Sequence, residues 1–237
     1  MFTYKGKTSK EMGLRVLNDL EFVSPVRDVD LIQVPGRDGD LIMDNGRFNS
    51  VVRSVPCILE VENSDIETRI NEINNWLATD VNFHDFEWKD NSEFKYLAKV
   101  EDSVVSSRLL SRLGNTTIDF RLHPIKYLKS SLVPRVVASG EMVVNPFTIP
   151  AKPILEIRGV GDITVSINQQ ELVLRGIGNG GCIVDTESQT ITDLTGTRTL
   201  FEFMYSGFPV LAPGNNVITF GTNVESILVT PRLGALV

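Results

Sequence analysis

Hydrophobic and polar residues alternate along much of the chain, which is the pattern of strands with one buried face. In the first half, this alternation predicts three strands, over 51–62, 94–101 and 116–122. Between the first two strands, apolar residues recur at helical spacing over 64–78, and the spacing of Ser64 and Glu67 fits a capping box. The pattern therefore predicts a β-rich first half that contains one amphipathic helix.

The second half of the chain has short β-rich segments separated by glycine, asparagine and proline turns. The predicted strands cover 153–158, 162–168, 171–175, 181–185, 189–193, 198–203, 216–220 and 225–230. Short strands at this spacing are typical of a β-sandwich or jelly roll. The alternation of Phe201, Phe203 and Tyr205 predicts a strand that turns these three rings toward the core.

Composition changes between the two halves. Residues 1–130 contain 17 Lys+Arg and 21 Asp+Glu, whereas the remaining residues contain 6 and 9. Three prolines between positions 146 and 153 disfavour a central strand or helix and predict an extended linker. The predicted division is a first domain over 1–135, a Pro-rich linker over 136–152 and a second domain over 153–237.

Charge and candidate chemistry narrow the function classes. The net charge of −7 disfavours binding to phosphate backbones. Cys57 and Cys182 have no second cysteine or histidine at ligand spacing, so we expect neither a disulfide framework nor a zinc site. His84 and His123 lie in no motif with a nucleophile or a second histidine. We therefore predict no catalytic residues, no metal, no cofactor and no enzymatic activity, and the apolar runs are too short for a membrane span.

Four segments, taken in order, carry a resemblance to a known family. They read VPGRDGDL at 34–41, RLHPIKY at 121–127, NP through PILEIRG at 145–159, and GFPVLAPGNN at 207–216. Together with the capped helix, these segments resemble the distal tail protein (Dit) of long-tailed, non-contractile bacteriophages. The resemblance covers essentially the whole chain, and it departs from the family after Pro231 and Arg232, where an aromatic residue is expected.

The resemblance implies an N-terminal domain that assembles into a homohexameric ring and a C-terminal galectin-like β-sandwich. It implies a structural protein of the phage tail tip, synthesised in the host cytoplasm and carried in the virion as part of the baseplate hub. Such a ring joins the tail tube to the baseplate or tail fibre and leaves a channel for DNA, which passes through without specific binding. The implied partners are further copies of the chain, the tail tube protein, a tail-associated baseplate or fibre protein and a receptor-binding protein.

Two sets of surface residues are candidates for recognition. Arg37, Asp38 and Asp40 lie in a loop flanked by glycines and are candidates for contact with a neighbouring subunit, with a solvated hairpin as the alternative. A function from another class also stays open, namely a carbohydrate-binding adhesion module that recognises host cell-wall polysaccharide. In that case Tyr205 and Phe208 are the candidate sugar contacts.

Overall fold

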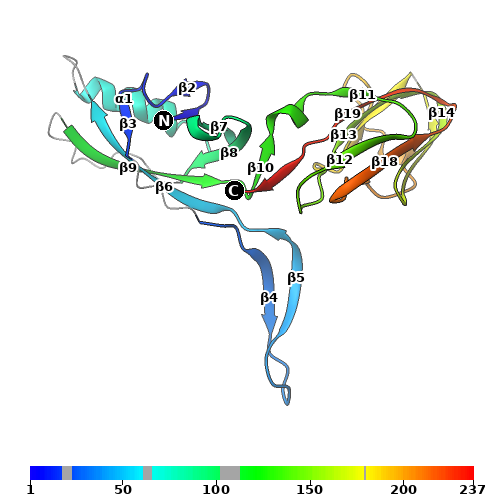
Figure 1. Ribbon diagram of the computed structural model, residues 1–237, viewed down its shortest axis with the longest axis horizontal. Helices are drawn as coiled ribbons and strands as arrows, with labels where there is room; N and C mark the ends of the chain where they lie inside the picture. The colour runs from blue at the N-terminus through cyan, green and yellow to red at the C-terminus, as the bar shows by residue number, and fades with distance from the viewer. Residues whose placement is uncertain (18–22, 61–65, 102–112, 179) are drawn as a thin grey trace. The chain divides into compact units, whose positions relative to one another are not determined.

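The computed structural model describes residues 1–17, 23–60, 66–101, 113–178 and 180–237 (Figure 1). The fold is mainly β, as predicted, and it divides into two compact units. The first unit comprises Met1–Lys126 with Leu236–Val237, and the second unit comprises Tyr127–Ala235. The chain therefore passes between the units twice.

The secondary structure of the first unit begins with three short strands and ends with three longer ones. Its elements are β1 (Phe2–Tyr4), β2 (Lys7–Thr8), β3 (Leu14–Val16), β4 (Arg27–Ile32), β5 (Leu41–Phe48), β6 (Val51–Glu60), α1 (Ile66–Leu77), β7 (His84–Trp88), a 3₁₀ turn (Lys89–Asn91), β8 (Phe94–Val100) and β9 (Leu113–Leu122). Strands β10 (Ile125–Leu128) and β20 (Gly234–Leu236) lie where the chain passes between the units. The predicted helix and the three predicted strands are confirmed as α1, β6, β8 and β9, while the capping residue Ser64 lies outside the described residues.

The sheet of the first unit is antiparallel and has the order β2-β1-β7-β8-β9-β6-β3. Its core-facing positions on β6 alternate as predicted, with Val55, Cys57 and Leu59 buried. Helix α1 buries Ile73, Trp76 and Leu77 in the same core.

Aromatic rings fill the centre of this core. The rings of Phe2, Phe86 and Phe120 lie 4.9–5.4 Å apart by their centroids. Trp76 packs beside them, and its indole Nε1 donates a hydrogen bond to the Tyr4 carbonyl at 3.0 Å. The helix is thus held to β1 by a polar contact as well as by apolar burial.

The second unit is a sandwich of two antiparallel sheets. Its elements are β11 (Arg135–Val137), β12 (Glu141–Asn145), β13 (Ile154–Gly159), β14 (Gly161–Ile167), β15 (Gln170–Ile177), β16 (Gly181–Asp185), β17 (Thr190–Thr192), β18 (Gly214–Phe220) and β19 (Val224–Thr230), with 3₁₀ helices at Lys129–Leu132 and Phe201–Phe203. The five-stranded sheet has the order β11-β19-β13-β16-β17, and the four-stranded sheet has the order β12-β18-β14-β15. Side chains from both sheets, among them Leu155, Ile157, Val165 and Leu174, form one core.

The predicted linker over 136–152 differs from the structure. This segment contains β12 and most of β11, which are edge strands of the two sandwich sheets. The prolines do not interrupt these strands because they lie between the end of β12 and the start of β13. The buried Asn145 amide donates hydrogen bonds to the carbonyls of Ile149 and Leu211 at 2.9 and 3.0 Å, which ties the proline-containing segment to the sandwich.

The predicted strand over 198–203 is wrong, whereas the other seven predicted strands of this half are confirmed. The chain forms the 3₁₀ helix Phe201–Phe203 there, so the three rings do not lie together on one core-facing side of a strand. Phe201 and Tyr205 are exposed, and Phe203 packs partly buried against the core. Position 205 is set by the backbone of β15, because the Tyr205 N–H donates to the Val173 carbonyl at 2.9 Å.

Candidate interaction surfaces

Strands β4 and β5 form a hairpin of their own, which we call the arm (residues 27–48; Figure 1). Among the described strands they pair only with each other. At the tip, the Arg37 N–H donates to the Val34 carbonyl at 3.1 Å. Gly36 and Gly39 on either side have φ values of 80° and 76°, a conformation that glycine adopts without steric cost.

All residues from 29 to 47 are exposed to solvent, although many of them are apolar. The exposed apolar side chains of the arm are Val29, Leu31, Ile32, Val34, Leu41, Ile42 and Met43. Leu31 and Ile42 are 62% and 67% exposed, values more typical of charged side chains. The arm therefore presents apolar surface to water that the rest of the described chain does not cover.

This apolar surface lies on both faces of the arm. Leu31 and Ile42 are register partners, and side chains of directly opposed residues lie on the same face of an antiparallel pair. Ile32 and Leu41 are the next register pair and therefore lie on the opposite face. An ordinary surface hairpin has one apolar face and one polar face, whereas the arm exposes apolar side chains on both faces.

Polar contacts fix the base of the arm. Arg27 pairs with Asp44 at 2.8 Å, and its guanidinium lies 4.9 Å from the centroid of the Phe48 ring. Arg47 pairs with Asp28 at 2.6 Å. The register shifts between Arg27 and Val29, as at a β-bulge, so the base is bent relative to the apolar part. The charges of the base are neutralised within the arm and leave the apolar part as its distinctive surface.

The predicted contact residues Arg37, Asp38 and Asp40 lie at the tip of the arm and are exposed. The sequence prediction located this loop but missed the apolar residues on the strands that carry it. The available signal was the pair of apolar groups Leu31–Ile32 and Leu41–Met43 on either side of the PGRDG turn.

A second candidate surface lies on the sandwich, at the exposed aromatic rings. Tyr205 is 66% exposed, and the Arg175 guanidinium lies 5.8 Å from its ring centroid. Arg175 also approaches Asp162 at 3.4 Å. The two candidate sugar contacts differ in burial, because Phe208 packs against the core while its ring centroid lies 6.3 Å from that of the exposed Phe201.

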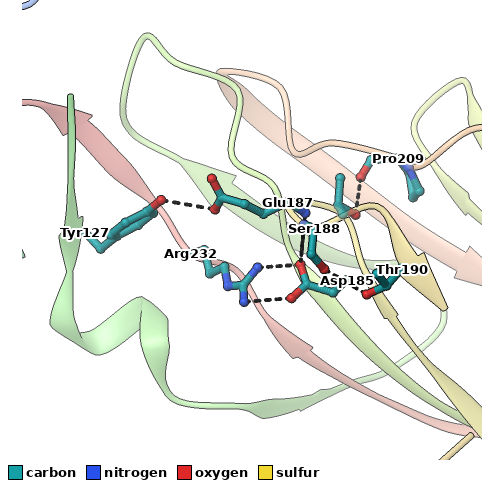
Figure 2. A network of polar contacts seen from close by, with 8 residues as sticks. Tyr127, Asp185, Glu187, Ser188, Thr190, Pro209 and Arg232 are labelled. Atoms are coloured by element: carbon teal, nitrogen blue, oxygen red, sulfur yellow. Dashed lines mark hydrogen bonds and ion pairs between the residues drawn. The ribbon is translucent and has the colours of Figure 1, made fainter. Parts of the chain in front are cut away.

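A network of polar contacts ties the two ends of the second unit together (Figure 2). The Tyr127 hydroxyl donates to the Glu187 carboxylate at 3.1 Å. Arg232 binds Asp185 through both terminal guanidinium nitrogens, at 2.6 and 3.0 Å. Burial alone raises the pKa of Asp185, but the hydrogen bonds and charge of Arg232, together with neighbouring backbone N–H groups, lower it overall.

The remaining titratable groups show structural contacts. His84 Nε2 lies 2.6 Å from the Asp80 carboxylate, and this hydrogen bond together with one from Lys5 lowers the pKa of Asp80. Both cysteines are buried and free, and burial raises the pKa of each thiol to about 12. Within the described residues, no group of three or more His, Cys, Asp or Glu side chains is placed to hold a metal ion. The described helices also include none with the length and apolarity to cross a membrane.

A β-rich first unit with one helix and a hairpin, followed by a β-sandwich unit, is a Dit-like fold. The chain superposes on the Dit protein (gp 19.1) of phage SPP1 with a TM-score of 0.73 and 16% sequence identity, over 96% of each chain. That protein is described as a paradigm of the hub adsorption apparatus in phages that infect Gram-positive bacteria.

A second solved structure is less similar. A chain of the phage p2 baseplate, in its activated conformation, superposes with a TM-score of 0.50 and 9% identity, over 92% of this chain and 89% of that chain. No family model matches the sequence, and no curated protein matches it. The resemblance predicted from the sequence is therefore confirmed at the level of the fold.

Proposed function

We propose that this protein is a structural subunit of a phage tail tip, where six copies form a ring that joins the tail tube to the baseplate or tail fibre. The observation that carries this proposal is the shared fold with the SPP1 hub protein along nearly the whole length of both chains. The arm supports it independently, because a two-faced apolar hairpin is the kind of element that becomes buried in an assembly.

In this proposal the protein is part of the virion and does no catalysis. Its partners are the neighbouring copies, the tail tube protein and a tail-associated baseplate or fibre protein, with a receptor-binding protein docked outside the ring. The net charge of −7 on each copy favours a channel that lets DNA pass without binding it. A channel lined mainly by Lys and Arg in an assembled ring would contradict this part.

The mass of the purified full chain tests the ring. One chain has a mass of 26.3 kDa, so a six-membered ring has about six times that mass in native mass spectrometry or light scattering. The same chain as a monomer, at the protein concentrations and salt of a virion reassembly, would refute the ring. Electron microscopy of the same sample shows whether the particles are closed.

A second candidate function is saccharide binding by the sandwich. The observation that favours it is the exposed ring of Tyr205 beside the Arg175 guanidinium, which in turn approaches Asp162, because sugars stack on aromatic faces and hydrogen-bond to charged groups. Binding of the full chain to purified host cell-wall polysaccharide, lost in Tyr205→Ala, would support this function. Phe208→Ala is a less direct probe because that ring also packs against the core.

A further inference from the structure

Strand β5 contains an Asn-Gly dipeptide at Asn45 and Gly46, near the base of the arm. Asparagine is chemically labile because the backbone nitrogen of the next residue can attack its side-chain amide. Glycine at the next position favours this attack, since it has no Cβ to hinder the approach of its nitrogen. Both residues are exposed to solvent. The dipeptide therefore has the sequence and the exposure that spontaneous deamidation requires.

The regular strand pairing of the arm does not include this dipeptide. The register shifts between Arg27 and Val29, and residues 45–47 have no register partner in the pairing of β5 with β4. Residues in such a bulge leave the ladder and bend the strand. Gly46 has a φ of 73°, far from the extended conformation of a strand. The backbone at this dipeptide can therefore rotate without breaking the register pairs on either side.

A carboxylate lies at the attacking nitrogen. The Gly46 N–H donates a hydrogen bond to Asp44 Oδ1 at 2.8 Å. A general base must lie about 2.6–3.2 Å from the atom whose proton it removes, and this contact satisfies that condition. The other oxygen of the carboxylate, Oδ2, accepts a hydrogen bond from Arg27 at 2.8 Å, which fixes its orientation. Asp44 is thus placed to take the proton from the Gly46 nitrogen during the attack.

We propose that Asn45 is a site of spontaneous deamidation in which the Asp44 carboxylate acts as the general base. The Gly46 nitrogen loses its proton to Asp44 and bonds to Cγ of Asn45. The bond from Cγ to the amide nitrogen then breaks, and the proton returned by Asp44 leaves with that nitrogen as ammonia. Water opens the resulting cyclic imide at either of its carbonyl carbons, which gives aspartate or isoaspartate at position 45. This inference does not depend on the proposed ring.

The conversion changes the base of the arm. The Asn45 amide donates a hydrogen bond to Asp30 Oδ2 at 3.3 Å, between the two strands. Aspartate at position 45 replaces this donor with a negative charge facing Asp30, and like charges on opposed strands are destabilising. Isoaspartate also lengthens the backbone by a methylene group, because the chain then continues through the side-chain carbonyl carbon. Both products weaken a two-stranded hairpin, which is marginally stable by itself.

Peptide mapping of the purified full chain tests the site. Trypsin cleaves after Arg37 and Arg47, and the peptide 38–47 contains Asn45 as its only asparagine. Native chain and chain in urea are kept at the same near-neutral pH, and mass spectrometry with an isoaspartyl methyltransferase assay follows both products over time. The native chain is expected to convert at least as fast as the chain in urea, where the contact with Asp44 is lost. Conversion in urea but not in the native chain would overturn the proposal.

Two substitutions isolate the role of Asp44. Asp44→Ala removes the base and is expected to slow conversion of the native chain at least about tenfold, since general-base catalysis typically contributes more than this. Arg27→Gln is the matched control, because it breaks the ion pair with Asp44 but keeps the contact between Asp44 and the Gly46 nitrogen. Its rate should stay within about threefold of the unchanged chain. An unchanged rate in Asp44→Ala, or equal slowing by both substitutions, would overturn the assignment of Asp44.

Hydrogen exchange gives a second readout, of the effect on the arm. Asn45→Asp reproduces one product, and Asn45→Ser is the control that removes the amide without adding a charge. The amides of the arm are expected to exchange roughly two- to fivefold faster in Asn45→Asp than in Asn45→Ser. Unchanged tryptophan fluorescence shows that the first unit still folds in both variants. Equal exchange of the arm amides would overturn the stated effect of the conversion.

Discussion

Arg232 is the best place to measure what holds the second unit together. Its side chain makes a two-point ion pair with Asp185, and the two side chains are 21% and 22% exposed. Its backbone has a φ of 52°, which costs a non-glycine residue about 1 kcal/mol. The Arg232 N–H donates to the Ser131 carbonyl at 3.1 Å, so a backbone hydrogen bond and the side-chain ion pair together hold this strained conformation.

Arg232→Ala removes the ion pair and keeps the strain. A charge-assisted pair of this burial contributes about 2 kcal/mol, between the small value of a surface pair and the larger cost of breaking a fully buried one. The free energy of unfolding of the second unit is expected to fall by about 2 kcal/mol. Arg232→Gly removes the same pair but tolerates the positive φ, so the loss should be smaller by roughly 1 kcal/mol.

The two units require separate probes. Both tryptophans, Trp76 and Trp88, belong to the first unit, so tryptophan fluorescence during urea unfolding follows that unit. Hydrogen exchange by mass spectrometry follows the backbone amides of β16 and β19 in the second unit. The expected result is faster exchange in the second unit with an unchanged fluorescence transition.

A double-mutant cycle with Asp185→Asn isolates the pair from the strain. The double variant with Arg232→Ala should be less destabilised than the sum of the two single variants. Additive losses would show that the pair contributes nothing to stability. An Arg232→Gly variant as unstable as Arg232→Ala would refute the part of the reasoning that concerns the backbone.

Three further predictions concern the same unit and the two cores. Tyr127→Phe removes the hydrogen bond to Glu187 and should lower the stability of the second unit by about 1 kcal/mol, measured by hydrogen exchange. Because the pKa of Asp185 is lowered on folding, its ionised carboxylate stabilises the folded protein above the unfolded pKa of about 4, and this stabilisation is lost as the pH falls through the lower folded value. Acid unfolding of Asp185→Asn should therefore show a weaker pH dependence than that of the protein with Asp185. Cys57 and Cys182 should not react with a thiol reagent at pH 8 in the native protein and should both react in denaturant, since burial raises both pKa values to about 12; fast labelling of the native chain would contradict this.

The sequence by itself determined the elements in which the spacing of apolar residues follows from the burial of one face. The alternation over β6 and the helical spacing in α1 arise because one face of each element contacts a core, and both elements formed where predicted. The same holds for seven strands of the sandwich. The resemblance carried by short ordered segments likewise predicted the fold that the comparison with SPP1 Dit confirmed.

Where a sequence pattern fits more than one conformation, only the tertiary structure decided which conformation forms. Alternation assigned Phe201 and Tyr205 to the core, but the 3₁₀ helix and the bond from Tyr205 to β15 turn them outward. The prolines after β12 resembled a linker, although Asn145 binds that segment to the sandwich. In the arm, apolar residues on both faces hide the period of two, because that period appears only when one face is buried and the other meets water.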